Sequence, residues 1–511
     1  MIKSLLLLFL VMTISCKKNE KNGEPDPKFA IDSTKIGSFF TKFPEFKAYE
    51  SEIKSLYKKQ NYQYVWYDDD GRNDFAEVLY NKASQLDAEG VPVDLPYKIE
   101  FAALFSDNKK KPDLENELLI SSMYFFYAKK VYAGLDPQQS KQMGWYLPRE
   151  KVSYVDYLDT LMKDDALLKK DEKELIGQYY NLRKSLQQYR DVQSKGGWRT
   201  ITLAEGSKTL KAGDNNAAVA QLRKRLLLSG DLKSDSGSSV FDSSLTDALR
   251  NYQRRHHLKE SGVADSGLIK DLNIPVEERI KTIIVNMERC RWIAPEYTEV
   301  EEFIAVNIPS YQLRYIKNGK PALESNVVVG KELNKTVVFS GKMSYLVFSP
   351  YWNIPKSILE KEIKPGIAKD KNYLAKHNME WHNNMVRQKP GKDNSLGLVK
   401  FMFPNSNNIY LHDTPAKSLF EKEDRALSHG CVRVEKAREL AIKILEGDKN
   451  WNTEKIDAAM QSGKEKNYTL NHKIPVYIAY FTAWADENGQ VSFYNDIYER
   501  DAHLAKMLYN Q

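Results

Sequence analysis

The sequence has few cysteines, no long apolar run beyond its first residues, and no concentration of charge of one sign. Three cysteines among 511 residues are too few for a disulfide framework. Hydrophobic residues make up 42% and charged residues 28%, which excludes a disordered, collagen-like or polytopic membrane chain. The 76 basic and 69 acidic residues are scattered, so the net charge of +7 forms no concentrated basic face, and we expect no nucleic-acid partner. This length predicts two to four domains.

The first 16 residues have the pattern of an export signal. Lys3 precedes an apolar run at 5–12, which is too short for a permanent membrane span. Polar residues follow Cys16 at once, which argues against a buried helix. A cysteine placed directly after a small residue resembles a bacterial lipobox, and this resemblance implies lipidation of Cys16; plain secretion is the alternative. We therefore expect a membrane-anchored lipoprotein of the periplasm or cell envelope, with a signal segment at 1–16 and a polar linker at 17–34.

Between residues 35 and 200 the hydrophobic pattern is mostly helical. The run at 115–132 carries apolar residues three and four positions apart, with few helix breakers. No cluster of His, Asp or Cys occurs in this region. We predict a helical scaffold domain at 35–200.

A compact unit follows at 203–273. Gly230 is expected to end its first helix, and Asp242 or Ser243 to cap the second. His256 and His257 are adjacent and point to different helix faces, so packing or solvated roles are expected rather than metal ligation. The order Gly-Asp, Val-x-x-Leu, Gly-Asp-Leu, Phe-Asp and Ala-Leu-x-x-Tyr-Gln resembles the small three-helix peptidoglycan-binding domain.

A connecting helix at 276–291, within a segment 276–300, carries Cys290 on its apolar stripe, so this thiol is predicted to be packed in the core. The periodicity then changes to that of strands. The expected elements are strands at 303–308, 311–316, 323–329 and 475–481 and a helix at 436–445. Asn318-Gly319 predicts a type I′ hairpin turn. We predict a β-rich domain at 301–485 with an inserted helical cap at about 350–400, then an extension at 486–511.

The candidate chemistry lies in His412-Asp413 and in the run from Ser428 to Arg433, Ser-His-Gly-Cys-Val-Arg. A thiol attacks an acyl carbon as the thiolate, so Cys431 needs a base or a positive field nearby. Gly430 permits unusual torsions, and the N–H groups around it are placed to meet an oxyanion. Two alternatives stay open on the pattern alone. One is a zinc site of His412, His429 and Cys431, for which Asp413 is the only nearby candidate as a further ligand. The other is a buried structural cysteine.

The spacing His-x(15)-Ser-His-Gly-Cys-Val-Arg resembles the signature of the YkuD-type L,D-transpeptidases. The order of helical scaffold, peptidoglycan-binding module and catalytic domain with a cap is similar to the larger YcbB-like branch, as are the segments at 480–484 and 496–498. The implied fold class is multidomain α+β, with a helical N-terminal scaffold, a small three-helix domain and a β-rich YkuD-type catalytic domain.

This resemblance implies a role for each residue of the signature. Cys431 is the nucleophile and His412 is its general base, oriented by the carbonyl of Asp413. His429 and Gly430 form part of the oxyanion hole. Arg433 holds the loop or a substrate carboxylate, and Ser428 supports the loop. The implied reaction cuts before the terminal D-Ala of a peptidoglycan tetrapeptide stem through a thioester and forms 3→3 cross-links, without metal or cofactor. Carbapenem β-lactams are the implied inhibitors.

Three other functions remain open at the level of sequence. Water as the acceptor would make the protein an L,D-carboxypeptidase. A catalytically idle protein that binds peptidoglycan would tether the membrane to the wall. A cysteine peptidase of ordinary L,L-bonds is the third. The insert is expected to act as a lid that excludes water and so favours an amine acceptor.

Overall fold

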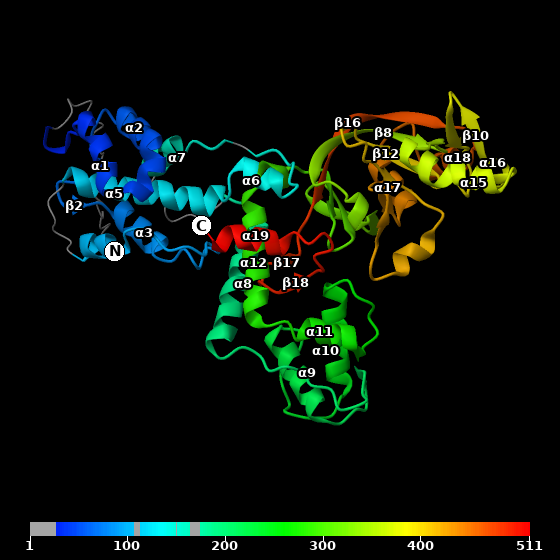
Figure 1. Cartoon of the computed structure of the whole chain (residues 1–511), viewed down its shortest axis with the longest axis horizontal. Helices are drawn as coiled ribbons and strands as arrows, with labels where there is room; N and C mark the ends of the chain where they lie inside the picture. The colour runs from blue at the N-terminus through cyan, green and yellow to red at the C-terminus, as the bar shows by residue number, and fades with distance from the viewer. Residues whose placement is uncertain (1–26, 107–112, 150, 164–173, 511) are drawn as a thin grey trace, which may run out of the picture. The chain divides into compact units, whose positions relative to one another are not determined.

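The computed structural model describes residues 27–106, 113–149, 151–163 and 174–510. Cys16 and the predicted signal segment lie outside these residues. The chain divides into two compact units. Figure 1 colours the chain by residue number, so the segments of each unit can be followed in it. The first consists of Met1–Asn81, Pro96–Phe126 and Tyr154–Met162, and the second of Lys82–Leu95, Tyr127–Ser153 and Lys163–Gln511. The segment 35–200, predicted as one helical scaffold, therefore contributes to both units.

The first unit is helical. Its helices are α1 (Ile36–Lys42), α2 (Glu50–Lys59), most of α3 (Asp74–Ala83), α4 (Lys98–Phe105), most of α5 (Leu114–Ala128) and most of α7 (Tyr154–Lys163). The buried carboxylate of Glu117 accepts hydrogen bonds from the N–H of Val65 (2.6 Å) and the hydroxyl of Tyr57 (2.9 Å). These bonds offset part of the cost of burial, which raises the pKa of Glu117 to about 7.

The second unit contains a three-helix module, as the sequence predicts. Its helices are α9 (Ala217–Leu228), α10 (Ser243–Arg255) and α11 (Ser266–Leu272), beside the short pair β3 (Thr209–Leu210) and β4 (Ala264–Asp265). Asp242 caps α10 by accepting from the N–H of Leu245 at 2.9 Å. Gly230, with φ of 76°, follows the end of α9 in the left-handed conformation that closes a helix. Leu222, Leu249 and Leu272 lie in the separate core of this module.

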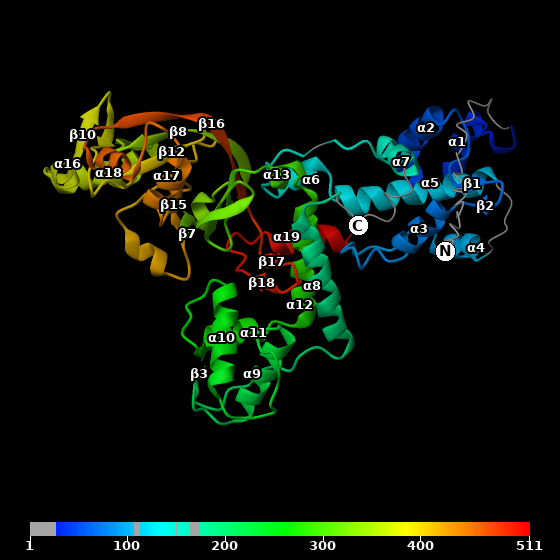
Figure 2. The ribbon, with the colours of Figure 1, turned by 180° about the vertical axis from the view of Figure 1, so that it is seen from behind.

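Two long helices, α8 (Gly177–Ser194) and α12 (Val276–Arg291), pack side by side, and both views show them together (Figures 1 and 2). Cys290 on α12 is fully buried, which confirms the predicted core thiol. His256 is also a packing residue, because its Nδ1 lies 3.0 Å from the carbonyl of Phe493 and its ring stacks on Tyr252. Within the described residues, no helix has both the length and the apolar character needed to cross a bilayer.

The β-rich domain is built on a nine-stranded sheet in the order β14-β7-β15-β13-β12-β8-β16-β5-β6. The strands are β5 (Phe303–Asn307), β6 (Gln312–Lys317), β7 (Lys320–Gly330), β8 (Phe339–Phe348), β12 (Val399–Met402), β13 (Leu411–His412), β14 (Ala426–Ser428), β15 (Val432–Val434) and β16 (Lys466–Ala479). An additional pairing of β7 with β6 closes this order into a ring. Asn318 and Gly319 both have positive φ between β6 and β7, which confirms the type I′ turn.

Two expectations for this domain need correction. The late strand predicted at 475–481 is the end of β16, which begins at Lys466 and crosses a bulge between Thr469 and Ile474. The cap is only partly helical. It contains β9 (Trp352–Asn353), α14 (Lys356–Ile358), the π-helical turn η7 (Leu359–Ile363), α15 (Lys364–Lys369), α16 (Tyr373–Lys376), β10 (Met379–His382) and β11 (Met385–Gln388). Its three strands form a separate sheet over a small apolar core of its own.

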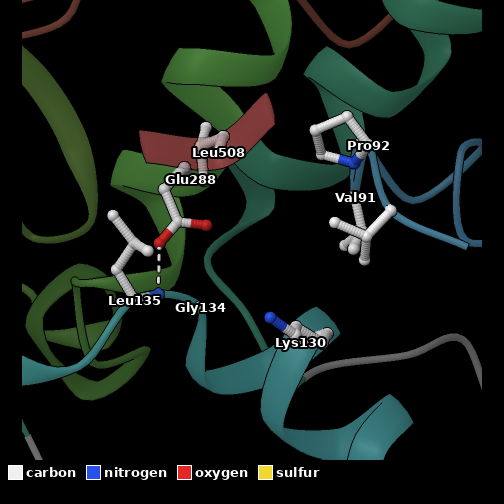
Figure 3. Close-up of a pocket in the computed structure, with 9 residues that line it drawn as sticks. Val91, Pro92, Lys130, Gly134, Leu135, Glu288 and Leu508 are labelled. Atoms are coloured by element: carbon white, nitrogen blue, oxygen red, sulfur yellow. Dashed lines mark hydrogen bonds between the residues drawn. The ribbon is translucent and has the colours of Figure 1, made fainter. Parts of the chain in front are cut away.

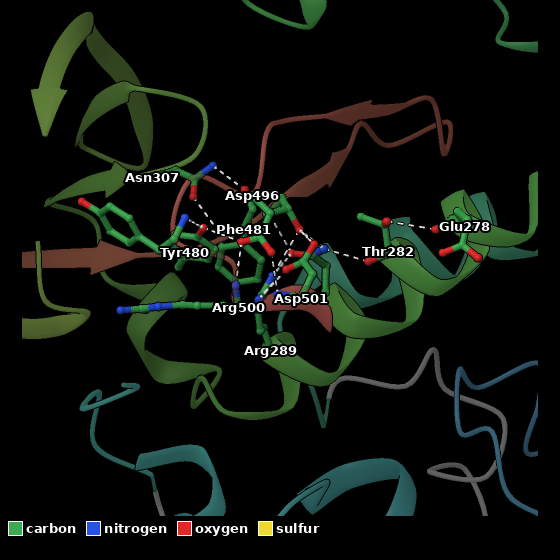
Figure 4. A network of polar contacts seen from close by, with 12 residues as sticks. Glu278, Thr282, Arg289, Asn307, Tyr480, Phe481, Asp496, Arg500 and Asp501 are labelled. Atoms are coloured by element: carbon green, nitrogen blue, oxygen red, sulfur yellow. Dashed lines mark hydrogen bonds and ion pairs between the residues drawn. The ribbon is translucent and has the colours of Figure 1, made fainter. Parts of the chain in front are cut away.

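Helices and a C-terminal segment complete the second unit. They are α6 (Pro137–Gln142), α13 (Glu296–Glu299), α17 (Ala437–Leu445), α18 (Thr453–Gln461), the pair β17 (Ala483–Ala485) and β18 (Val491–Phe493), and α19 (Asp501–Tyr509). Near β17, Arg289 of α12 donates to Asp501 at 2.7 Å and to the hydroxyl of Thr482 at 3.2 Å, within the polar network of Figure 4. This buried network joins α12 to the C-terminal segment.

Candidate active site

The register of three strands places the candidate residues on one face of the sheet. Lys400 of β12 is the partner of His412 on β13, and His412 is the partner of Arg433 on β15. Residues directly opposite in a sheet point to the same face, so these three side chains share one face. The alternate positions Phe401, Leu411 and Val432 are fully buried on the other face. The alternation of apolar and polar residues therefore fixes which side of the sheet carries the site.

His412 is buried and is oriented by its neighbour in the chain. Its Nδ1 lies 2.5 Å from the carbonyl oxygen of Asp413, and a carbonyl only accepts, so Nδ1 carries the proton. Nε2 is therefore the basic nitrogen. Burial lowers the pKa of His412 to about 3, with a further lowering by the charge of Arg433, while hydrogen bonding to the backbone of Asp413 opposes the shift. The imidazole is neutral at neutral pH and able to accept a proton.

Asp413 is itself held on three sides. Its Oδ1 accepts from the ammonium of Lys417 at 2.7 Å, and its Oδ2 accepts from the N–H of Leu398 at 2.9 Å. Its own N–H donates to the carbonyl of Val399 at 2.9 Å. A Cβ atom on Gly397 would lie 2.4 Å from the Asp413 carboxyl carbon, so only glycine allows the two segments to meet. These contacts fix the direction of the carbonyl that orients His412.

Cys431 directly precedes β15 in the chain. The N–H of Val432 donates to the carbonyl of Tyr410 at 3.2 Å, which brings Cys431 beside Tyr410. The thiol donates to the carbonyl of Asn408, with Sγ 3.7 Å from that oxygen. Burial raises the pKa of Cys431, while hydrogen bonds from Tyr410 and the charges of Lys400 and Arg433 oppose the rise. At rest the thiol and the imidazole are thus both neutral.

Ser428 and Gly430 shape the turn that carries the thiol. The Ser428 hydroxyl donates to the carbonyl of Cys431 at 2.6 Å and accepts from the N–H of Gly430 at 3.1 Å. Gly430 has φ of 118°, a conformation that a side chain would strain. The Gly430 N–H is therefore occupied, which differs from the expectation that the N–H groups around Gly430 face an oxyanion together. In the described part of the chain, the N–H of Cys431 donates to no protein acceptor.

His429 points toward the cap. Its Nε2 lies 3.2 Å from the Oε1 of Glu362 in η7, and its side chain is 44% exposed. The structure therefore places His429 between the sheet and the cap and gives it no contact with the thiol among the described interactions.

Two cations face the site without a carboxylate partner. Within the described residues neither Lys400 nor Arg433 lies at ion-pair distance from a carboxylate, although the charge of Glu465 acts on Lys400 and partly opposes the lowering of its pKa. The Nε of Arg433 is buried without a hydrogen-bond partner. The ammonium of Lys400 lies 5.0 Å from the centre of the Tyr410 ring. Burial lowers the pKa of both cations. The sequence analysis missed Lys400 and Tyr410, although a lysine between two apolar strand residues, Val399 and Phe401, is a readable signal.

Two other features of the described residues bear on the choice of site. Across the described segments, no three His, Cys, Asp or Glu side chains are grouped as metal ligands. A small pocket elsewhere in the second unit is lined by Lys130, Gly134 and Glu288, among others (Figure 3). The carboxylate of Glu288 accepts from the N–H of Leu135 and from the indole of Trp292, both at 2.7 Å. These bonds give Glu288 a structural role, and the sheet face remains the candidate site.

Comparison with protein-family models gives three matches. Residues 301–455 match the YkuD L,D-transpeptidase catalytic domain, residues 51–186 a "Scaffold domain", and residues 215–272 a "Putative peptidoglycan binding domain". By this match, residues 301–455 are similar to YkuD-type L,D-transpeptidase domains. The predicted combination of helical region, peptidoglycan-binding domain and β-rich L,D-transpeptidase domain is thereby confirmed.

The chain is also similar to known proteins. A "Putative L,D-transpeptidase" of Haemophilus influenzae is 33% identical over 297 residues, 53% of this chain and 58% of the relative. The match thus spans less than two thirds of that protein. Two solved L,D-transpeptidases resemble the chain. The one from Stackebrandtia nassauensis has 13% identity and a TM-score of 0.23, covering 54% of this chain and 97% of that one. The one from Mycobacterium smegmatis has 10% identity and a TM-score of 0.21, covering 35% and 58%.

Proposed function

We propose that the protein is a cysteine-dependent L,D-transpeptidase that cuts peptidoglycan tetrapeptide stems before the terminal D-Ala and forms 3→3 cross-links. The observation that carries this proposal is that a neutral imidazole, held through Nδ1, and a half-buried thiol are both influenced by the charges of Lys400 and Arg433 on one face of the sheet. In the described structure the imidazole of His412 is a weak base and the thiol of Cys431 is not an ion-paired thiolate. The thiol therefore loses its proton to His412 as it attacks, which is general-base catalysis.

The proposed reaction has two halves. In the first, Sγ of Cys431 attacks the carbonyl at the L-centre of the third stem residue while its proton moves to His412. The N–H of Cys431 stabilises the oxyanion. The intermediate collapses to a thioester, and D-Ala leaves with the proton from His412. In the second half, the side-chain amine of another stem attacks the thioester, His412 takes a proton from that amine, and the thiol is restored. These steps need no metal or organic cofactor.

The two cations explain how such a substrate would be held. Arg433 and Lys400 flank His412 and lack carboxylate partners, and a stem that ends in D-Ala carries a carboxylate next to the bond to be cut. A planar guanidinium binds a carboxylate through two parallel hydrogen bonds. Arg433 is therefore assigned to the substrate carboxylate, and Lys400 supports the developing negative charge near the thiol.

The proposal also covers the cellular location of the enzyme and its inhibition by β-lactams. Export and lipidation at Cys16 would anchor the enzyme in the periplasm or cell envelope beside its substrate, with the three-helix domain binding the glycan. Carbapenems are proposed as inhibitors that acylate Cys431, because they offer a strained acyl group to the same thiol.

The deciding experiment compares the purified chain with its Cys431→Ala variant on disaccharide-tetrapeptide, with products read by mass spectrometry. We expect a cross-linked dimer that has lost one D-Ala, absent from the variant. Tripeptide alone would favour the carboxypeptidase alternative. No change in the peptide, together with intact binding of both proteins to sacculi, would overturn the enzymatic proposal in favour of a wall tether. Casein serves as the control for ordinary peptidase activity.

A further inference from the structure

The carbonyl of Gly430 accepts a hydrogen bond from a residue outside the Ser428–Arg433 signature. The hydroxyl of Thr336, which is fully buried, donates to this carbonyl at 2.9 Å and accepts from the N–H of Gly330 at 2.8 Å. The Gly430 carbonyl and the Cys431 N–H belong to one peptide group, and the described chain has no cis peptide bond. In a trans peptide these two groups point in opposite directions. The hydrogen bond from Thr336 therefore sets the direction of the Cys431 N–H.

Thr336 is in turn held by Tyr498, which is almost completely buried. The Tyr498 hydroxyl donates to the carbonyl of Gly330 at 2.5 Å and accepts from the N–H of Thr336 at 3.1 Å. One phenol thus ties together both ends of the loop from Gly330 to Thr336. The loop begins at Gly330, the last residue of β7, and forms most of the connection to β8, which starts at Phe339.

Tyr498 lies between Asp496 and Arg500 in the chain, two residues of the polar network that Figure 4 labels together with Tyr480. Its N–H donates to the hydroxyl of Tyr480 at 2.8 Å, and the two rings stack with centres 5.5 Å apart. Tyr480 donates to Asp496 at 2.5 Å, and Asp496 accepts from the N–H groups of Arg500 (2.9 Å) and Asp501 (2.7 Å). Every polar group in this series has a partner, so the phenol of Tyr498 has a fixed position.

Packing leaves little freedom between the loop and the thiol-bearing turn. A Cβ atom on Gly330 would lie 2.0 Å from the carbonyl oxygen of Asn334 and 3.1 Å from the Cα of Gly430. The two backbones are in direct contact at this point. A change in the position of the loop must therefore displace Gly430.

We propose that Thr336 is a positioning residue for acyl transfer, and that Tyr498 holds it in place. Thr336 fixes the Gly430–Cys431 peptide so that the Cys431 N–H meets the oxyanion. This inference rests on the proposed function. It adds that the rate of acyl transfer depends on one hydroxyl that touches neither the substrate nor the thiol.

The test compares the full chain with its Thr336→Val and Thr336→Ser variants. Valine has the shape of threonine without the hydroxyl, and serine keeps the hydroxyl. Three quantities are measured: kcat and KM for thioester formation on disaccharide-tetrapeptide, alkylation of Cys431 by iodoacetamide, and the melting temperature. Alkylation needs the thiol and its base but forms no oxyanion, so it separates peptide orientation from thiol reactivity.

For Thr336→Val we expect kcat to fall by about tenfold to a hundredfold, somewhat less than the loss seen when an oxyanion donor is removed outright. KM and the rate of alkylation should stay unchanged, and Thr336→Ser should restore kcat. An unchanged kcat in the valine variant would overturn the inference. So would a parallel fall of kcat and alkylation, because that indicates general damage to the site.

Two further measurements keep the outcomes separate. Rates are taken well below the melting temperature of each variant, since the valine variant leaves the Gly330 N–H unpaired and is expected to melt earlier. Tyr498→Phe, which frees the loop while leaving Thr336 intact, should lower kcat in the same selective way, and a normal kcat would remove Tyr498 from the proposal. A parent chain that alkylates normally but forms no thioester would overturn the proposed function, and the inference with it.

Discussion

Glu362 of the cap and His429 of the thiol-bearing segment are in polar contact, with the Nε2 of His429 3.2 Å from the Oε1 of Glu362. The carboxylate comes from the π-helical turn η7, and the imidazole lies two residues before Cys431. Both side chains are about half exposed, at 53% and 44%. Exposed pairs contribute little to stability because solvent screens them. We therefore expect the contact between Glu362 and His429 to influence the position of the cap and not the stability of the fold.

Replacing Glu362 by Gln should make Cys431 more accessible. Without the carboxylate, the cap loses its contact with His429, and we expect iodoacetamide to alkylate the thiol about two- to fivefold faster, the range that an exposed pair allows. The melting temperature should not change. Glu360→Gln is the matched control, because Glu360 lies in the same turn and pairs with Lys364 inside the cap. Equal alkylation rates in the two variants would contradict a role for the pair in closure.

Arg433→Gln should weaken the use of substrates that carry a free terminal carboxylate. Hydrogen bonds to charged groups contribute about 1.5–3 kcal/mol, so we expect kcat/KM to fall by roughly tenfold to a hundredfold. The wild-type enzyme should show a similar loss on a stem whose terminal carboxylate is amidated, and the variant should show no additional loss on that stem. Arg438→Gln is the control, since Arg438 is exposed and pairs with Asp457. If the loss in the variant and the loss on the amidated stem added together, the terminal carboxylate would bind at a group other than Arg433.

The sequence predicted those parts of the fold that depend on local patterns. The apolar stripe of 276–291 gave α12 with its observed bounds, and Asn318-Gly319 gave the hairpin turn, because both signals are contained in a few adjacent residues. The start of β16 was missed because its first residues, Lys466 to Lys473, are mostly polar and exposed. They are a strand only because β8 pairs with them.

The site was predictable only in part for a similar reason. The signature residues from Ser428 to Arg433 are adjacent in sequence, so their type and spacing could be recognised directly. Lys400, Tyr410 and Thr336 reach the site through the register of three strands and through a loop, which no local pattern specifies. The contact of His429 with Glu362 depends on the fold of the cap. Long-range register was the missing information.

The buried, neutral His412 predicts a dependence of stability on pH. Its pKa is about 3 in the folded protein and 6.5 as the ordinary value, so between these limits only the unfolded chain binds the proton. His412 therefore contributes stability above pH 6.5 that is lost as the pH falls toward 3. We expect the difference in unfolding free energy between the wild type and His412→Gln to shrink by about 1.4 kcal/mol per pH unit in this window.

Denaturant unfolding at pH 4, 5, 6 and 7.5 measures this difference. His256 and His257, whose pKa values are also lowered by burial, are present in both proteins, so their contributions cancel. A difference that stays constant with pH would show that folding does not lower the pKa of His412. The imidazole would then titrate near its ordinary value of 6.5, and the electrostatic description of a buried, neutral base would be wrong.

The buried pair of Arg289 and Asp501 should be sensitive to the loss of one partner. Burial raises the pKa of Asp501, and the charge of Arg289 opposes that rise. Arg289→Met leaves the carboxylate unpaired, so we expect a loss of about 3–5 kcal/mol in unfolding free energy at neutral pH. The folded variant then holds a proton on Asp501 more readily than the unfolded chain, so its stability is lost as the pH rises above about 4. The difference in unfolding free energy from the wild type should therefore be smallest in acid.

Adding Asp501→Asn removes the unpaired charge and should recover part of the loss at neutral pH. A gap that is independent of pH, with no recovery in the double variant, would mean that Arg289 acts through its packing against Tyr480 and not through the charge of Asp501.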